Sequence, residues 1–141
     1  MDRVTTTITV INHIDEILAE RGFIPRDEIR SLTLENVLVD TGATQLCLPE
    51  EAIAGLGLTR LTLAGEIEVK TAMGTKKSRV FENARLSVAG REGRYDCWEL
   101  PAGEDPLLGL IPLEALGLEP DLQNQRLKLL PNRGQQNYLR I

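Results

Sequence analysis

The sequence predicts an all-β domain with only two short helices. Several segments are rich in β-branched residues or alternate between apolar and polar side chains, and glycine-containing turns separate them. Helical signatures occur at only two places along the chain. The 141 residues, with 42% hydrophobic and 26% charged, have the size and composition of one folded domain. Because only 4% are aromatic, we expect a core of Leu, Ile, Val and Ala.

The N-terminal part contains two predicted strands. Residues 5–11 consist entirely of threonine, isoleucine and valine, which favour a strand. Residues 12–25 are a predicted connection that can hold a helical turn at 15–19. A second strand is expected over residues 29–39, because its apolar residues alternate and then form an uninterrupted run. A polar turn at 40–44 follows directly.

The first predicted helix comes shortly after this turn. Residues 46–48 are apolar, and the next stretch opens with Pro49, Glu50 and Glu51 and ends at Gly57. Proline and acidic residues favour the first turn of a helix, and glycine favours its end.

A long hairpin is predicted in the middle of the chain. Residues 66–73 alternate between apolar and polar side chains, 73–75 read as a turn, and a second strand continues to residue 88. A further turn is expected at 90–93, followed by a strand at 95–100.

The sequence also contains an internal resemblance. Residues 107–118 follow the same order as residues 37–58: an apolar strand, a glycine turn, a helix signature with proline near its start, and Leu-Gly-Leu. The second copy supplies the second predicted helix. A true repeat would relate two halves by a pseudo-two-fold axis, and similar composition is the alternative explanation. Residues 125–130 are the last predicted strand, so we expect one domain over 1–130 and a polar tail over 131–141.

Charge and composition exclude several classes of function. The net charge is −5, and the densest basic group is Lys76-Lys77 with Arg79 nearby, so we expect neither a nucleic-acid partner nor a membrane partner. No apolar run approaches the ~18 residues of a membrane span. The N-terminus lacks the apolar segment of a signal peptide, so a cytoplasmic location is expected. Cys47 and Cys97, with one histidine, are too few for a disulfide framework or a zinc site; we expect reduced core thiols and no metal.

The sharpest chemical feature is Asp40-Thr41-Gly42-Ala43-Thr44. An apolar strand delivers Asp40 into a tight turn with no neighbouring arginine or lysine to pair with it. A buried carboxylate is costly unless it is hydrogen-bonded or shares a proton. The two threonines supply hydroxyls, and Gly42 permits a backbone that other residues would strain. The segment fits either a carboxylate held in an apolar cleft or a plain turn that begins with aspartate.

Residues 37–44 resemble the active-site signature of retropepsin-like aspartic proteases, in which apolar residues precede Asp-Thr-Gly-Ala. The resemblance continues through the Pro49-led helix and through the hairpin containing 71–74, where the family has its flap. Leu107-Leu108-Gly109, followed by a helix, matches the apolar-apolar-Gly motif that braces the active-site loop in the family. Together these segments extend the resemblance over roughly residues 5–130.

The resemblance implies a closed β-barrel that is half of a dimeric aspartic protease. Asp40 from each subunit of a homodimer would meet at the two-fold axis and activate a water that hydrolyses a peptide or protein substrate, without a cofactor. Thr41 and Gly42 would support the active-site loop. The family pattern further assigns substrate binding to Ala43, Thr44, Ala72, Met73, Gly74 and Leu107, and support beneath the site to Leu108 and Gly109.

Two other functions compete with this interpretation. A non-catalytic aspartic-protease-like domain could bind peptides or mediate dimerisation, since the Leu110 position is charged in many relatives and Lys76-Lys77 flank the flap tip. The turn also fits the Asp-x-Gly-x-Thr phosphate-binding turn of the actin and sugar-kinase superfamily, but this chain is too short and has too little helix for that fold. Of the remaining candidates, His13 is expected in a turn or on the surface, Trp98 in the core, and Asp105 either on the surface or in contact with substrate.

Overall fold

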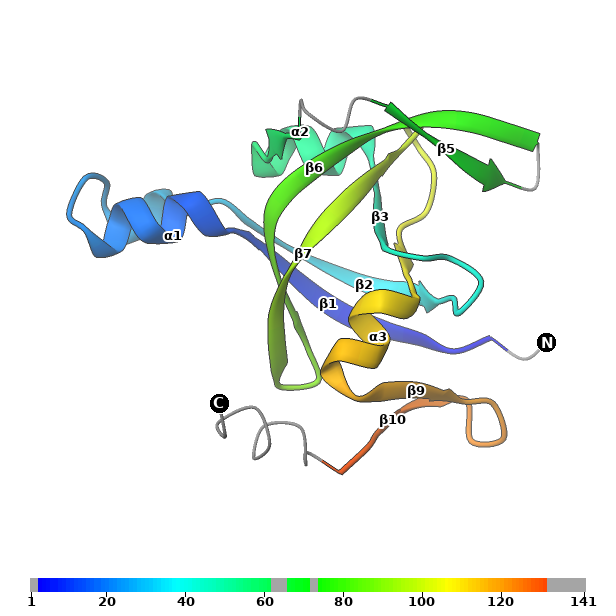
Figure 1. Cartoon of the computed structure of the whole chain (residues 1–141). Helices are drawn as coiled ribbons and strands as arrows, with labels where there is room; N and C mark the ends of the chain where they lie inside the picture. The colour runs from blue at the N-terminus through cyan, green and yellow to red at the C-terminus, as the bar shows by residue number, and fades with distance from the viewer. Residues whose placement is uncertain (1–2, 62–65, 72–73, 132–141) are drawn as a thin grey trace, which may run out of the picture.

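The computed structural model describes residues 3–61, 66–71 and 74–131 (Figure 1). Six strands build the main body: β1 (Thr5–Asn12), β2 (Ser31–Val39), β3 (Leu46–Pro49), β6 (Gly74–Val88), β7 (Arg91–Leu100) and β8 (Leu107–Leu108). The shorter or peripheral strands are β4 (Thr59–Arg60), β5 (Glu66–Thr71), β9 (Leu118–Asp121) and β10 (Arg126–Leu129). The helices are α1 (His13–Glu20), the 3₁₀ helix η1 (Arg26–Glu28), α2 (Glu50–Leu56) and α3 (Leu110–Leu116).

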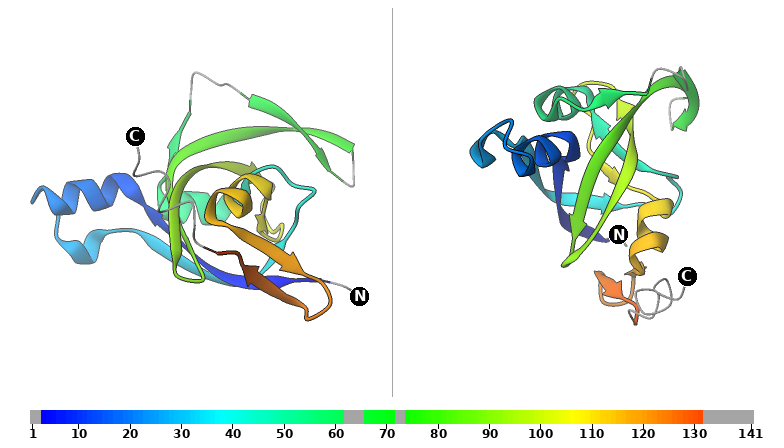
Figure 2. Two further views of the ribbon diagram at one scale, coloured as in Figure 1. Left: turned by 60° about the horizontal axis from the view of Figure 1, so that its bottom comes forward. Right: turned by 60° about the vertical axis from the view of Figure 1, so that its left-hand side comes forward.

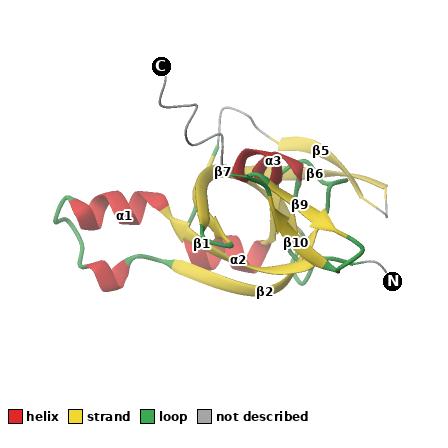
Figure 3. Cartoon of the chain, turned by 90° about the horizontal axis from the view of Figure 1, so that it is seen from below, coloured by secondary structure: helices red, strands yellow, loops and turns green. Residues whose placement is uncertain are grey.

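The main strands close into a barrel. They pair in the order β1-β2-β8-β3-β7-β6, and β6 pairs back onto β1 to complete the ring. Figure 3 shows the ring from below, with α1 projecting away from it. Strands β4 and β5 pair with β6, whereas β9 and β10 form a separate two-stranded sheet. The predicted all-β fold, including the closed barrel implied by the family resemblance, is confirmed.

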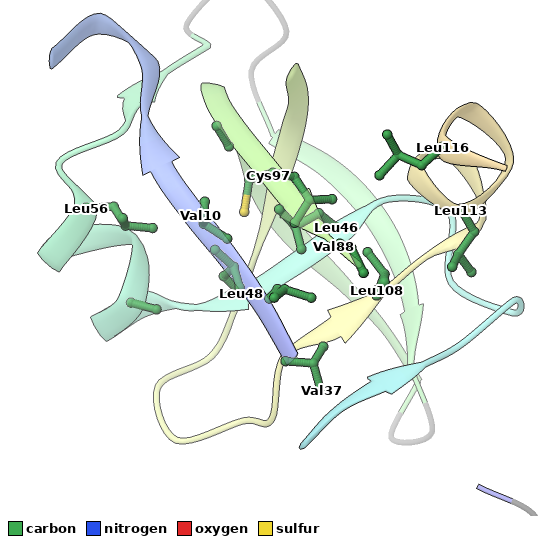
Figure 4. Packing of buried hydrophobic residues seen from close by; sticks show 14 of the residues in the cluster. Val10, Val37, Leu46, Leu48, Leu56, Val88, Cys97, Leu108, Leu113 and Leu116 are labelled. Atoms are coloured by element: carbon green, nitrogen blue, oxygen red, sulfur yellow. The ribbon is translucent and has the colours of Figure 1, made fainter. Parts of the chain in front are cut away.

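The core is aliphatic, as the low aromatic content predicts. Side chains from several strands and from α2 and α3 gather in a common interior (Figure 4). Burying one such side chain fully contributes roughly 1.5–3 kcal/mol, so this layer is a principal source of stability. The largest side chains that are almost completely buried include Ile8, Val10, Val37, Leu46, Leu48, Leu56, Leu86, Val88, Leu108 and Leu113.

The connection after β1 differs from the prediction, because it holds a full helix rather than a single turn. Helix α1 is eight residues long and projects away from the barrel (Figure 1). The side chain of Asn12 caps it, since its oxygen accepts a hydrogen bond from the Asp15 backbone N–H at 3.0 Å. The described residues therefore contain three α-helices where two were expected.

An ion pair closes the base of the arm formed by residues 12–30. Arg30 donates from Nε and Nη2 to the two oxygens of Asp15 at 2.9 and 3.0 Å, and its backbone N–H also donates to Asp15. These hydrogen bonds hold the pKa of Asp15 below its ordinary value, against the opposing effect of burial. The Asn12 amide donates to the Leu56 carbonyl at 2.9 Å, which ties the arm to the end of α2.

The internal resemblance in the sequence corresponds to two similar structural units. Helices α2 and α3 each have seven residues and follow a short barrel strand, and each ends at a left-handed glycine, Gly57 (φ 63°) or Gly117 (φ 66°). A side chain caps the last carbonyls of each helix. The Asn12 amide donates to the carbonyls of Leu56 and Gly57 at the end of α2. The Arg91 guanidinium donates to the carbonyls of Leu116 and Gly117 at the end of α3, at 2.9 and 2.8 Å.

Several boundaries differ from the sequence-based ones. The expected turn at 90–93 is a tighter one at Ala89-Gly90, where both residues have positive φ, so β7 begins earlier, at Arg91. Strand β9 was not predicted, whereas the hairpin of β5 with β6 and the final strand β10 were. The tail from 132 onward lies outside the described residues, and the domain boundary near 130 stays a prediction.

Candidate active site

The Asp40 loop is the segment that leaves β2 and returns as β3. Strand β8 lies between these two strands: it pairs in parallel with β2, Val39 opposite Leu108, and antiparallel with β3, Leu46 opposite Leu108. The loop of residues 40–45 therefore crosses the end of β8. The barrel thus fixes both ends of the loop against the same short strand.

Backbone hydrogen bonds from β8 and α3 brace this loop along its length. The Asp40 N–H donates to the Leu108 carbonyl at 3.0 Å. Further along, the N–H of Leu110 donates to the Ala43 carbonyl at 2.8 Å, and that of Ile111 donates to the Thr44 carbonyl at 2.9 Å. The first turn of α3 therefore uses N–H groups that have no partner inside the helix to hold the loop.

Gly109 is required at this contact because there is no room for a side chain. A Cβ atom at this position would lie 2.3 Å from the Gln45 carbonyl oxygen, 2.7 Å from the Gln45 nitrogen and 2.9 Å from the Ala43 carbonyl oxygen. All three are backbone atoms, which cannot move aside without moving the loop. The glycine in Leu107-Leu108-Gly109 thus serves close packing, since its φ of −91° is open to any residue.

The Asp40 carboxylate is partly exposed at the end of its strand. One oxygen, Oδ1, accepts a hydrogen bond from the Gly42 N–H at 2.9 Å, and the Ala43 N–H donates to the Asp40 carbonyl at 3.1 Å. The aspartate-initiated turn therefore exists, and it orients the carboxylate. Within the described part of the chain, no cationic side chain forms an ion pair with Asp40, so a second reacting group can approach it.

The thiols of Cys47, which lies near Asp40, and of Cys97 are buried in the core. Burial raises the pKa of the Cys47 thiol to about 12, and the nearby charge of Asp40 adds to this effect. Burial also raises the pKa of Cys97 well above its ordinary value. Both cysteines are free and buried, so they act as neutral core thiols rather than as nucleophiles.

The predicted site residues outside the flap fall into two groups in the structure. Thr41, Gly42 and Thr44 are exposed and Ala43 is half-buried, so the tip of the loop faces outward. Leu107 is half-buried beneath the loop, and Leu108 and Gly109 are buried. These residues lie together around Asp40, and their roles in substrate binding and loop support stay predictions.

The predicted flap residues are less completely described. Gly74 is exposed and has a φ of 113° at the start of β6, while Ala72 and Met73 lie outside the described residues. Figures 1 and 2 show the hairpin of β5 and β6 extending from the barrel on the same side as the Asp40 loop. Contact between this hairpin and a substrate stays a prediction.

Sequence reasoning missed the role of Leu110 and Ile111, which hold the loop through their backbone N–H groups. No side-chain signal could have indicated it, because any residue except proline supplies an N–H. Of the other candidates, His13 contacts Glu16 at 3.2 Å on the projecting arm, Trp98 is half-buried on β7, and Asp105 is exposed.

Other kinds of site receive no support from the described residues. No group of three or more His, Cys, Asp or Glu side chains in this part of the chain is arranged to hold a metal ion. Over the same residues, no helix has the length and apolar character needed to cross a membrane.

A closed β-barrel with a carboxylate-bearing loop braced by β8 and α3 defines a retropepsin-like aspartyl protease domain. The chain belongs to the family described as gag-polyprotein putative aspartyl protease, whose sequence model matches residues 33–115. The match covers the Asp40 loop, α2, the long hairpin and the bracing strand β8. Among curated proteins, none matches the chain.

Proposed function

We propose that the protein is an aspartic endopeptidase that acts as a homodimer, with Asp40 of each subunit forming the catalytic pair. The observation that carries the proposal is the bracing of the Asp40 loop by β8 and the first turn of α3, with the loop tip exposed. A rigid loop that presents one carboxylate outward is half of a two-carboxylate site. A second copy supplies the other half through the same surface.

The mechanism follows from two carboxylates placed close together. Because like charges repel at short range, the pair holds one proton between them. The ionised carboxylate takes a proton from a bound water, which attacks the carbonyl carbon of the peptide bond. The protonated carboxylate donates to the carbonyl oxygen, and a proton then passes to the leaving amine.

The surrounding residues have supporting roles in this proposal. Thr41 links the two loops across the dimer axis, and Gly42 orients the carboxylate through its N–H, which donates to Asp40 Oδ1. The substrate binds in an extended conformation beneath the hairpin of β5 and β6. Ala43, Met73 and Leu107 favour apolar side chains next to the cleaved bond.

The decisive experiment is digestion of a peptide library by the wild-type chain beside Asp40→Asn. Asparagine keeps an oxygen that can accept the Gly42 N–H, so the loop is retained, but the amide can neither act as a base nor share a proton. We expect the variant to have less than a few per cent of wild-type activity and an unchanged circular dichroism spectrum and melting temperature. Asp27→Asn, a matched change of an exposed aspartate in η1, should keep full activity.

The same experiment separates the catalytic function from a binding function. If wild type cleaves nothing in the library but retains bound peptides equally with Asp40→Asn, the protein is a peptide-binding module. If Asp40→Asn cleaves as well as wild type, Asp40 has no catalytic role.

A further inference from the structure

A polar pocket lies beside the far end of the Asp40 loop. Its volume is about 310 Å³, and it is lined by Gln45, Glu82, Asn83, Arg94, Tyr95, Asp96 and Ile111. Two of these residues connect it to the candidate active site, because Gln45 directly follows Thr44 in the chain and Ile111 holds the Thr44 carbonyl at 2.9 Å. Gln45 lies five positions after Asp40, so the backbones at these two positions lie within ~17 Å of each other.

A bulge in β6 shapes this pocket. Phe81 pairs with Cys97 and Ala84 pairs with Tyr95, so Glu82 and Asn83 together face the single residue Asp96 on β7. Asn83 adopts a positive φ of 68° to make this possible. Bulges of this kind redirect side chains out of the regular alternation and are frequent beside functional sites.

The carboxylates of the pocket lack the arginine partner that three other partly or fully buried acidic residues have. Asp15, Glu16 and Glu99 each bind an arginine, at distances of 2.7–2.9 Å. Glu82 and Asp96 are half-buried as well, yet within the described ranges neither carboxylate has an ion-pair or hydrogen-bond partner.

The polar lining of the pocket also includes Gln45 and Arg94. Gln45 Oε1 is out of contact with solvent and has no hydrogen-bond partner, although a buried carbonyl oxygen normally has one. Arg94, the one cation among the lining residues, is exposed and forms no ion pair with Glu82 or Asp96 in the described structure. The two carboxylates of Glu82 and Asp96 therefore line the pocket without an ion-pair partner among the described residues.

We propose that this pocket binds a basic side chain, lysine or arginine, of the substrate at a position away from the cleaved bond. The inference rests on the proposed function, because an extended substrate that passes Ala43 and Thr44 leaves the site beside Gln45. An ammonium or guanidinium group supplies several N–H donors and one positive charge, which match the two carboxylates. At about 3.3 Å per residue, the basic residue lies within about five positions of the cleaved bond.

The test compares peptides that differ in one charge. In a peptide cleaved by the wild-type enzyme, each position from five before to five after the cleaved bond is occupied in turn by lysine and by glutamine. We expect kcat/KM to be roughly threefold to fivefold higher with lysine at one or two of these positions, the effect of a partly exposed ion pair. In the double variant Glu82→Gln/Asp96→Asn, the ratio of lysine to glutamine should fall to about one.

A matched control removes two charges elsewhere. Glu35→Gln/Glu114→Gln changes the net charge equally at exposed positions of β2 and α3, and it should keep the lysine preference. Equal loss of the preference in both double variants would show that only long-range charge acts, and would overturn the proposal. Absence of a lysine preference at every position would also overturn it.

A binding experiment separates this inference from the proposed catalysis. Nα-acetyl-lysine methylamide is titrated into the Asp40→Asn chain, with the norleucine analogue as the neutral comparison, and the ¹⁵N amide signals of Gln45, Asn83 and Asp96 are followed. Shifts with lysine alone that disappear in Glu82→Gln/Asp96→Asn support the pocket even if no peptide is ever cleaved. Equal shifts with both probes, or none, contradict the pocket even if the enzyme is an active protease.

Discussion

At the scale of single residues, the position of Asp40 depends on a glycine far away in the sequence. Gly109 lets β8 and α3 approach the loop so closely that backbone groups bond directly, with Leu110 N–H reaching the Ala43 carbonyl at 2.8 Å. The catalytic proposal needs the carboxylate held to within a fraction of an ångström, because rates fall steeply when reacting groups are misplaced. The glycine is therefore as important to the site as the aspartate.

We expect Gly109→Ala to displace the loop. Its Cβ would lie 2.3 Å from the Gln45 carbonyl oxygen, so backbone must move. The expected cost is about 1–3 kcal/mol in the free energy of unfolding, measured by urea denaturation, as for other overpacked sites. Peptide hydrolysis should fall by at least about tenfold.

Gly55→Ala is the matched control for this substitution. Gly55 lies in α2, where an added Cβ would meet nothing within 4 Å, and alanine favours helix, so this change should stabilise the protein by about 0.5–1 kcal/mol. A Gly109→Ala variant as stable and as active as wild type would show that the loop does not depend on this contact.

At the scale of elements, the projecting arm is attached to the barrel through polar contacts. Asp15 is only 4% exposed and is held by Arg30, while Asn12 both caps α1 and donates to the end of α2. A carboxylate this deeply buried is tolerable only while its partner remains in place. The ion pair therefore closes the arm on itself, while Asn12 joins the arm to the end of α2.

We expect Arg30→Gln to destabilise the protein by about 1–3 kcal/mol at pH 7, less than a fully buried pair costs because Arg30 itself is half-exposed. The pKa of Asp15 is lowered in the folded state, so its stabilising contribution is complete above the unfolded value of ~3.9 and is lost as the pH falls through the folded value. The difference between wild type and variant should therefore shrink between about pH 5 and pH 2 in urea titrations.

Arg26→Gln provides the comparison, since Arg26 is exposed in η1 and has no ion pair within the described structure. It should change the free energy of unfolding by less than about 0.5 kcal/mol at any pH. A difference between wild type and Arg30→Gln that stayed constant down to pH 2 would mean that the arginine acts through packing rather than through the Asp15 charge.

At the scale of the whole molecule, one chain carries one braced Asp40 loop, and its tip faces outward. Under the proposed mechanism, which needs two such carboxylates, a single chain would be catalytically incomplete. Activity then depends on an association equilibrium as well as on the fold.

We expect specific activity per subunit to rise with protein concentration, following the dimer fraction measured by sedimentation. Adding excess Asp40→Asn should inhibit wild type, because random pairing puts most wild-type subunits into mixed dimers that have one usable carboxylate. Excess Glu114→Gln, an exposed change on α3, should not inhibit. Constant specific activity over a range where the protein is monomeric would exclude the two-chain site.

Local patterns predicted much of the fold and the turn that presents Asp40. The strands at 5–11 and 29–39, the helix that follows Pro49, and the long hairpin were predicted from alternation and capping residues. Helix α1 was underestimated because the capping role of Asn12 was overlooked. The turn at Ala89-Gly90 was misplaced because Gly93 suggested a later turn, although Gly93 lies inside β7.

The sequence by itself determined the all-β class, the aliphatic core and Asp40 as the candidate catalytic residue, because these depend on the local order of side chains. Only the tertiary structure decided how the loop is held and what lies beside it. Three of these contacts join segments that are distant in the chain. Ile111 donates a hydrogen bond to Thr44, Gly109 packs against the backbone of Gln45, and Gln45 lines the same pocket as Glu82 and Asp96. Residue types do not indicate which backbone N–H groups will form hydrogen bonds or where a bulge will form. These contacts are therefore determined only by the folded barrel.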